Sequence, residues 1–213
     1  MSQSDERRRS WKEIAMEVVG ERDLGRSREL AEELCDALAA LDPGNQSEGH
    51  EAENDPYLPL RTGHSIEYEE TVDEAVALMR SDYASMQMLF PERGTGGELL
   101  LLAYRGFNPR AARFWEWVRA DSKSTCGIAL RATQRVVAPD IPACDFMADS
   151  EDQQVYLQTG ILACQTTPLI ARDGNVVGML STHWRTPHQP TEEDFRRFDN
   201  LARQAADLIE RYR

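Results

Sequence analysis

Residues 166–195 read TTPLIARDGNVVGMLSTHWRTPHQPTEEDF, and this stretch decides the fold. Two runs rich in apolar and β-branched residues flank an Asp-Gly pair, which favours the tight turn of a β-hairpin. After the second run, Thr191 and Asp194 have the spacing of a helix capping box, with Asp in place of the usual Glu. The stretch therefore predicts two antiparallel strands followed by a helix, whose apolar stripe runs from Phe195 to Tyr212.

A second hairpin is predicted upstream. DYASMQMLF at 82–90 and ELLLLAYRGF at 98–107 have the composition of strands and are separated by a glycine-rich turn. A helix before them is indicated by apolar residues at helical spacing between Tyr68 and Met79. Asn108 and Pro109 predict the start of another helix, which we expect to continue through Val118. The remaining expected elements are a helix at 126–132, a strand at 136–141 and a helix at 148–159 that ends at Gly160.

This order of elements predicts an α+β fold. We expect an antiparallel sheet of five or six strands, with long helices (67–80 and 191–212) on one face and short helices and loops on the other. Residues 1–41 carry apolar residues at helical spacing and are predicted to form a helical N-terminal extension. Residues 42–66 are poor in apolar residues and rich in Pro, Gly and acids, so we expect an acidic flexible linker there.

Composition limits the function classes. The net charge of −13 repels phosphate backbones, so no nucleic-acid partner is expected. No apolar run is long enough to span a bilayer, and no apolar segment follows the basic N-terminal residues, so we expect a cytoplasmic protein without a membrane partner. The four cysteines include no CxxC pair, and they are expected to be reduced thiols.

Residues 67–213 resemble GAF domains, and most closely those of bacterial sensor histidine kinases. Four stretches carry the resemblance: DYASMQML at 82–89, STCGIALRATQRVVAPDI at 124–141, residues 166–195 and RQAADLIER at 203–211. It implies a sensory or regulatory domain that binds a small molecule and acts in bacterial signal transduction, with a kinase or another protein as its output partner. No kinase, cyclase or DNA-binding module follows Arg213, so we expect output through a partner, or a chain that is a fragment.

The resemblance leaves the ligand, and hence any cofactor, unidentified. Family members bind cyclic nucleotides, tetrapyrroles, haem, amino acids or small anions, and some bind nothing known. The asparagine-lysine pair of the cyclic-nucleotide motif has no counterpart here, and none of the cysteines has the adjacent histidine of bilin-binding members. Both ligands are therefore disfavoured.

Two residue types could carry chemistry. Cys126-Gly127 at a helix start resembles a site in the GAF-type enzyme that reduces free methionine sulfoxide, which makes a thiol-dependent enzyme the alternative function. The spacing from Cys164 to Pro168 is shorter than in that enzyme, and a buried structural thiol is the more common case, so we expect no catalytic residue. His183 could serve as a haem ligand, but a lone histidine is more often structural, and no set of zinc ligands surrounds it in sequence.

The two-residue period of strands places the expected pocket. Tyr83, Ser85, Gln87 and Leu89 share one face of the first hairpin, and Val177, Met179, Ser181 and His183 share one face of the second. We expect the polar members to face a ligand, and the alternative is that they bond only to one another and to buried water. The predicted ligand-binding residues are Gln87, Phe114, Trp115, Cys126, Asp140, Ser181 and His183, and no metal site is predicted.

The apolar helix stripes also predict assembly. The C-terminal stripe and the leucines from Leu30 to Leu41 offer more apolar surface than one sheet is expected to cover. A homodimer built on a bundle of these helices follows. A third hypothesis is a dimerisation scaffold that binds no ligand.

Overall fold

The computed structural model describes Tyr57 and residues 63–213, which belong to the second of two compact units, Tyr57–Arg213. The expected N-terminal helices and nearly all of the expected linker lie outside the described residues.

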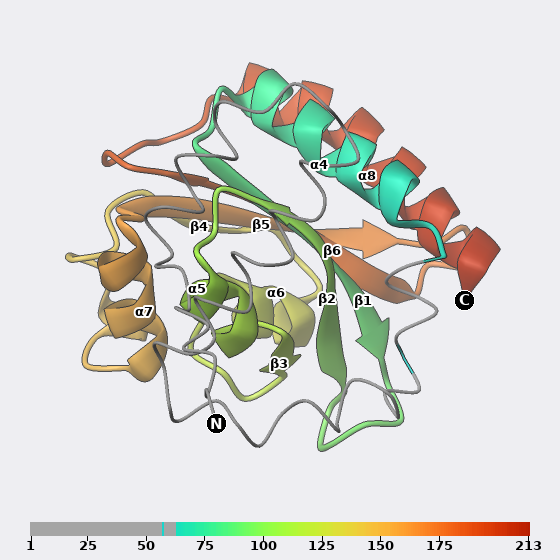
Figure 1. Cartoon of the computed structure of the whole chain (residues 1–213), viewed down its shortest axis with the longest axis horizontal. Coiled ribbons are helices and arrows are strands. Elements are labelled where there is room, and N and C mark those ends of the chain that lie inside the picture. Colours follow the sequence, from blue (N-terminus) through green and yellow to red (C-terminus); the bar gives the residue numbers. More distant parts are fainter. Residues whose placement is uncertain (1–56, 58–62) are drawn as a thin grey trace, which may run out of the picture. The chain divides into compact units, whose positions relative to one another are not determined.

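A six-stranded sheet forms the centre of this unit, with the strand order β3-β2-β1-β6-β5-β4 and every neighbouring pair antiparallel (Figure 1). Both predicted hairpins are present, and β1 of the first pairs with β6 of the second at the middle of the sheet. The α+β fold and the antiparallel sheet are therefore confirmed. The strands are β1 (Tyr83–Phe90), β2 (Glu98–Arg105), β3 (Trp117–Arg119), β4 (Val136–Ala138), β5 (Ala163–Ile170) and β6 (Val176–Trp184).

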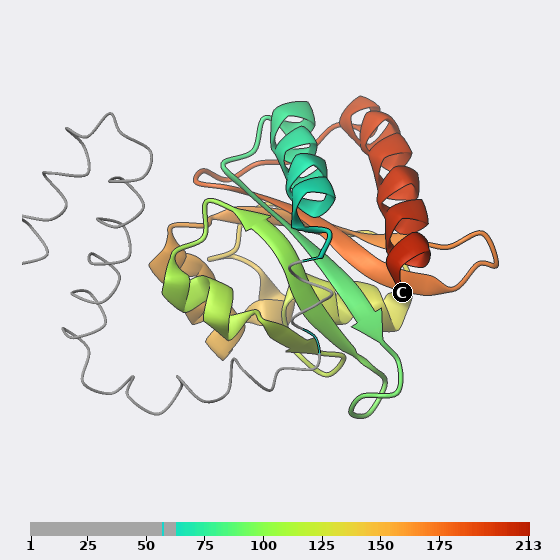
Figure 2. The same ribbon diagram turned by 45° about the vertical axis from the view of Figure 1, so that its right-hand side comes forward.

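The two long helices, α4 (Ser65–Met79) and α8 (Glu192–Tyr212), pack side by side on one face of the sheet (Figure 2). Their buried stripes meet Ala84, Met86 and Met88 of β1 in one apolar cluster. The capping box at the start of α8 is confirmed, since Thr191 Oγ1 accepts from the Asp194 backbone N–H and the Asp194 carboxylate accepts from that of Thr191. We call this side of the sheet the long-helix face.

Shorter elements cover the opposite side, which we call the short-helix face (Figures 1 and 2). Asn108 caps α5 through its side chain, Ser124 and Ser150 do the same for α6 and α7, and α7 ends at Gly160 with a left-handed backbone, as expected. The elements are α5 (Pro109–Phe114), α6 (Thr125–Ala132), the 3₁₀ turn η3 (Asp145–Met147) and α7 (Glu151–Thr159).

Two details differ from the sequence prediction. The helix expected to reach Val118 ends at Phe114, because residues 117–119 pair with β2 as an edge strand. Val177 was expected to share a face with Met179, but it packs in the long-helix cluster while Met179 packs on the short-helix side. The pairing of β5 with β6 shifts register at Leu169/Ile170, and a bulge of this kind breaks the alternation of side chains.

The C-terminal stripe is covered by the domain's own sheet. Phe198, Leu201 and Ala205 are at most 3% exposed, so this stripe does not require a second molecule to cover it. The homodimer stays a prediction, and the N-terminal leucines on which it also depends lie outside the described residues. Among the described helices, none is both long and apolar enough to cross a membrane.

Candidate ligand site

The short-helix face gathers most of the predicted site residues. Gln87 of β1 and Ser181 and His183 of β6 alternate with residues of the long-helix cluster and are at most 2% exposed. Trp115 and Cys126 belong to the apolar cluster on this side of the sheet. The strand period thus orients three polar side chains from two neighbouring strands toward the short helices.

One half of this polar group is satisfied internally. Thr166 Oγ1 lies 2.8 Å from both Thr125 Oγ1 and Ser181 Oγ, and Cys126 Sγ lies 3.5 Å from Ser181 Oγ. The same network reaches Cys164 Sγ and the Tyr156 hydroxyl through Thr125. Ser181 and Cys126 are therefore engaged with protein partners, as the alternative of mutual hydrogen bonding predicts.

The Cys126 thiol lies in an environment that disfavours the thiolate. Burial raises its pKa, and the hydrogen bonds with Ser181 and Thr166 only partly offset that effect. Burial also raises the pKa of Cys164 to about 12. Because the thiolate is the nucleophilic form, this arrangement suits a structural thiol rather than a catalytic one.

His183 is the other half of the polar group, and it has no hydrogen-bond partner. Both ring nitrogens are sealed from solvent without a partner, although a neutral imidazole has one donor and one acceptor to satisfy. Burial lowers the pKa of His183 to about 3, so the ring is neutral at pH 7. An unsatisfied buried group costs about 1–3 kcal/mol, so this position is unfavourable unless a ligand or water binds to it.

Aromatic side chains surround His183. Its ring centroid lies 5.4 Å from that of Phe107 and 5.9 Å from that of Tyr156, and Tyr83 is its cross-strand partner on β1. The Trp115 ring closes the group, at 5.2 Å from Phe107 and 4.6 Å from Tyr156. We call these four residues around His183 the aromatic box.

Gln87 lies at the other end of the polar group. It pairs with Met179, four residues before His183 on β6, and this separation corresponds to about 13 Å along the strand. Its side-chain oxygen is also buried without a partner. Ser181 lies between the two ends, in contact with Cys126, so Gln87 and His183 face the same side but do not share one open space.

The remaining predicted residues lie at the periphery. Phe114 is half-buried and packs edge-on against Trp115 at 5.8 Å. Asp140 is partly exposed after β4, where its backbone carbonyl accepts a hydrogen bond from Ala143. The Trp115 indole N–H also lacks a partner within hydrogen-bond geometry. Burial raises the pKa of Asp152, and its contacts with the Trp115 indole and Ser122 offset only part of that rise.

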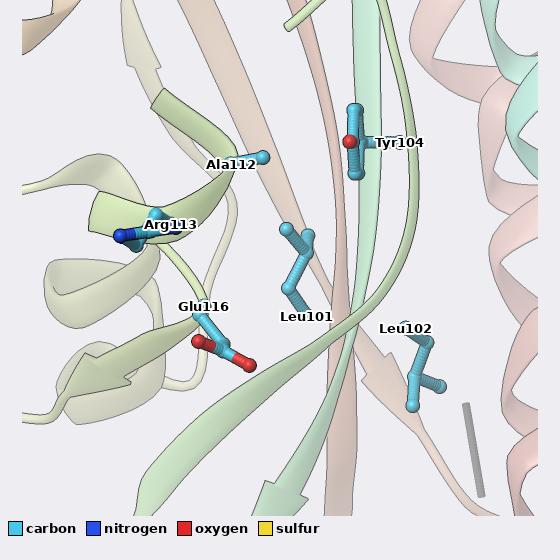
Figure 3. Close-up of a pocket in the computed structure, with 6 residues that line it drawn as sticks. All are labelled: Leu101, Leu102, Tyr104, Ala112, Arg113 and Glu116. Carbon is cyan, nitrogen blue, oxygen red and sulfur yellow. The ribbon is translucent and has the colours of Figure 1, made fainter. Parts of the chain in front are cut away.

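Several hollows open on the surface of the described unit. One of about 270 Å³ lies between β2 and α5, as Figure 3 shows, with Leu101 and Tyr104 on the strand and Ala112 and Arg113 on the helix. A second, of about 280 Å³, lies between α5 and α7. Ala111 and Val155 line this second hollow and belong to the same buried cluster as Trp115 and Tyr156. A third hollow, of about 240 Å³, reaches the aromatic box itself, because Trp115 lines it together with Phe114 and Asp152.

Sequence reasoning missed Phe107 and Tyr156, which bring the rings of the box together. Val155 and Tyr156 are the two buried residues of α7, and the apolar run Val155–Leu157 in a helix that is polar elsewhere was the available signal. Phe107 directly follows the turn at Gly106 that ends β2. Among the described residues, no three His, Cys, Asp or Glu side chains are grouped so as to hold a metal ion.

Comparison with known proteins identifies the architecture. The family model of the GAF domain matches residues 67–210. The domain of a two-component sensor histidine kinase protein from Sinorhizobium meliloti is 21% identical, with a TM-score of 0.54, and the match covers 70% of this chain and 91% of that one. The GAF domain from Acinetobacter phosphoenolpyruvate-protein phosphotransferase is 17% identical, with a TM-score of 0.54 and coverage of 68% and 80%.

An enzyme has the same fold. The type II free methionine-R-sulfoxide reductase from Thermoplasma acidophilum is 13% identical, with a TM-score of 0.54, and the match covers 72% of this chain and 96% of that one. At such identities the likeness establishes the fold alone. No curated protein sequence matches this chain.

Proposed function

This chain belongs to the GAF domain family, and from that premise we propose that it is a regulatory domain whose aromatic box binds a small molecule. One observation carries the proposal: both ring nitrogens of His183 are buried without a partner inside a ring of aromatic side chains. Buried polar groups are nearly always paired, and exceptions concentrate where a ligand or water supplies the partner. Concave sites with aromatic walls and a few polar groups are typical of small-molecule binding.

The box is closed in this structure, so binding requires its cover to move. That cover consists of α5, with six residues, α7, with nine, and the segments around them. Short helices of this length derive their stability from packing and separate at a lower free-energy cost than a central strand. The hollow lined by Trp115 supports an entrance beside these helices, because an opening there would connect solvent with Trp115, then with Tyr156 and then with His183.

Strand β6 supports transmission from the box to the helix layer. His183 faces the box, whereas Leu180 of the same strand packs in the long-helix cluster with α4 and α8. A second connection runs from Arg135, after α6, to Asp199 of α8, where the guanidinium also lies over the Phe195 ring. We infer that ligand binding shifts the relative populations of two arrangements of the sheet and the long helices. A kinase or another output partner would detect this shift through contact with α8.

A thermal-unfolding screen tests this proposal. The full chain and a His183→Phe variant are each mixed with a library of small metabolites, and native mass spectrometry is used to detect molecules that co-purify. Compounds that raise the unfolding temperature of the wild type but not of the variant would support the box as the site. Compounds that stabilise both proteins equally would contradict that location, and a library without a stabilising compound would contradict the function.

The thiol-dependent enzyme is the weaker proposal. Its support is the Cys126-Gly127 pair at the start of α6 together with the fold of the reductase. The burial of Cys126 and the raised pKa of its thiol argue against a nucleophile in this conformation. The homodimer is proposed independently of the ligand, and light scattering at tens of micromolar tests it, since a monomer at that concentration would contradict it.

A further inference from the structure

The chemistry of the aromatic box also limits the class of ligand, an inference that rests on the proposed function. His183 presents one N–H donor and one ring-nitrogen acceptor, because its imidazole is neutral at pH 7. Neither nitrogen has a protein partner, and the two point to opposite sides of the ring, so a compact ligand pairs with one of them and supplies an acceptor or a donor. A half-turn of the ring exchanges the positions of the two nitrogens and does not change this requirement, since neither has a partner.

The walls of the box favour a planar ligand. Phe107, Tyr156 and Trp115 present aromatic rings whose centroids lie 4.6–5.2 Å apart in neighbouring pairs. These rings already contact one another, so a flat group that enters between two of them replaces their mutual contact with two contacts of its own, each of about 0.5–1.5 kcal/mol. A flat group also fits between packed rings with the smallest displacement of α5 and α7.

Among the described residues, the box holds no buried counter-charge for a ligand, and the one guanidinium over its rings, that of the exposed Arg185, lies 5.2 Å from the centroid of Tyr83. The buried polar residues of the described unit carry hydroxyl, amide or imidazole groups, and none of them is an acid, lysine or arginine. The nearest carboxylate with an electrostatic effect on Tyr156 is Asp152, which is half-buried and already accepts hydrogen bonds from Ser122 Oγ and the Lys123 backbone N–H. An ion moved into such surroundings loses several kcal/mol of hydration without gaining a counter-charge.

We propose that the aromatic box takes an uncharged, planar ligand that carries a hydrogen-bond donor next to an acceptor, as primary amides, lactams and many nitrogen heterocycles do. Such a ligand pairs with one nitrogen of His183, as donor or as acceptor, and stacks on the rings without burying a charge.

Three probes of nearly equal size and shape test this ligand class. Benzamide is neutral and carries the donor–acceptor pair, whereas benzoate is an anion and benzamidinium a cation. Binding to the full chain is measured at pH 7.5 by isothermal titration and by saturation-transfer NMR. We expect benzamide to bind, and both ions to bind at least about 10-fold more weakly, because each ion must lose its hydration.

Variants of neighbouring residues on β6 locate the binding. His183→Phe should weaken benzamide binding by about 10-fold or more, and His183→Gln should retain more of it, since Gln keeps one donor and one acceptor. Thr182→Val is the matched control, because Thr182 is adjacent in the same strand and its side chain bonds to Gln165, away from the box. This control should bind benzamide as the wild type does.

The outcomes separate the two proposals. If benzoate or benzamidinium binds as tightly as benzamide, and His183→Phe removes that binding, the ligand class is wrong while the box remains a site. If benzamide binds the wild type and His183→Phe equally, the box is not where it binds, and both proposals are contradicted. If none of the three probes binds at millimolar concentration, the ligand class is contradicted, and the metabolite screen alone then decides the proposed function.

Discussion

His183 should make the stability of the domain depend on pH in a way that one substitution removes. The folded-state pKa is lowered to about 3 by burial, from an ordinary value of 6.5. Below pH 6.5 the unfolded chain therefore binds a proton at this position that the folded chain does not bind. The contribution is complete above pH 6.5, and stability is lost as the pH falls from 6.5 toward 3.

The size of the effect follows from linkage. Each pH unit within that window corresponds to about 1.36 kcal/mol, so lowering the pH from 7 to 5 should remove about 2 kcal/mol of unfolding free energy through His183 alone. In His183→Phe this contribution is absent, whatever the effect of the new ring on stability at pH 7. For each protein we therefore compare the change in unfolding free energy between pH 7 and pH 5. This change does not include the effect of the substitution on packing, which is the same at both pH values.

Urea unfolding of the full chain at several pH values between 7 and 5 measures this dependence. We expect the wild type to lose about 2 kcal/mol more than His183→Phe over that range. His188→Gln is the control, because His188 is partly exposed beside Trp184 and its loss should leave most of the pH dependence in place. Equal losses in the wild type and His183→Phe would refute the burial of an unpartnered neutral imidazole.

Three further predictions concern other parts of the domain. Cys126 should react with thiol reagents at pH 7 only at the rate at which the domain opens, because burial raises its pKa; rapid labelling together with reduction of free methionine sulfoxide would instead support the enzyme. Gly178→Ala should destabilise the domain by about 2 kcal/mol or more in urea, because the added Cβ would lie 2.1 Å from the Gln87 carbonyl oxygen. Gly174→Ala, with nothing within 4 Å of the added Cβ and only a positive φ to accommodate, should cost about 1 kcal/mol, and equal costs for the two glycine variants would contradict the close approach of β1 and β6. Thr191→Ala should cost about 1 kcal/mol by removing the N-cap of α8, and an unchanged urea midpoint would show that the cap contributes nothing.

Much of the fold could be predicted because local signals and burial agree. A few adjacent residues determine each of three local features, and the structure contains all three: the Asp-Gly turn, the capping box at Thr191 and the N-cap at Asn108. The alternation along β1 sorted Met86 and Met88 from Tyr83 and Leu89 correctly, because the extra residue in its pairing with β2 lies on β2 and because β1 is buried on both faces.

The errors come from features that local patterns do not specify. The bulge near Val177 depends on how β5 pairs with β6, and the edge strand β3 depends on pairing with β2 across the chain. The alternation of side chains along one strand does not show how that strand pairs with its neighbour. The alternation therefore assigned Val177 to the wrong face.

The candidate site could be predicted only in part for a related reason. Strand alternation identified which side His183 and Gln87 face, but not which atoms on that side find partners. Whether Ser181 is free or bonded depends on Cys126 and Thr166, which other elements supply. The box itself brings together Phe107, Trp115 and Tyr156 from three segments, and only the tertiary structure places these rings around one histidine.

The central claim is that the unpartnered ring nitrogens of His183 are a ligand-binding group. It is tested most directly in the wild-type protein, by recording the ¹⁵N signals of its histidine side chains with and without benzamide at pH 7.5, with His183→Phe used to assign the signal. The account predicts a neutral ring in the free protein and a change in the nitrogen shifts of His183, saturating with the binding curve, while the other histidines stay unchanged. Benzamide binding that leaves the His183 nitrogens unchanged, or a His183 ring that is already charged in the free protein at this pH, would contradict the account.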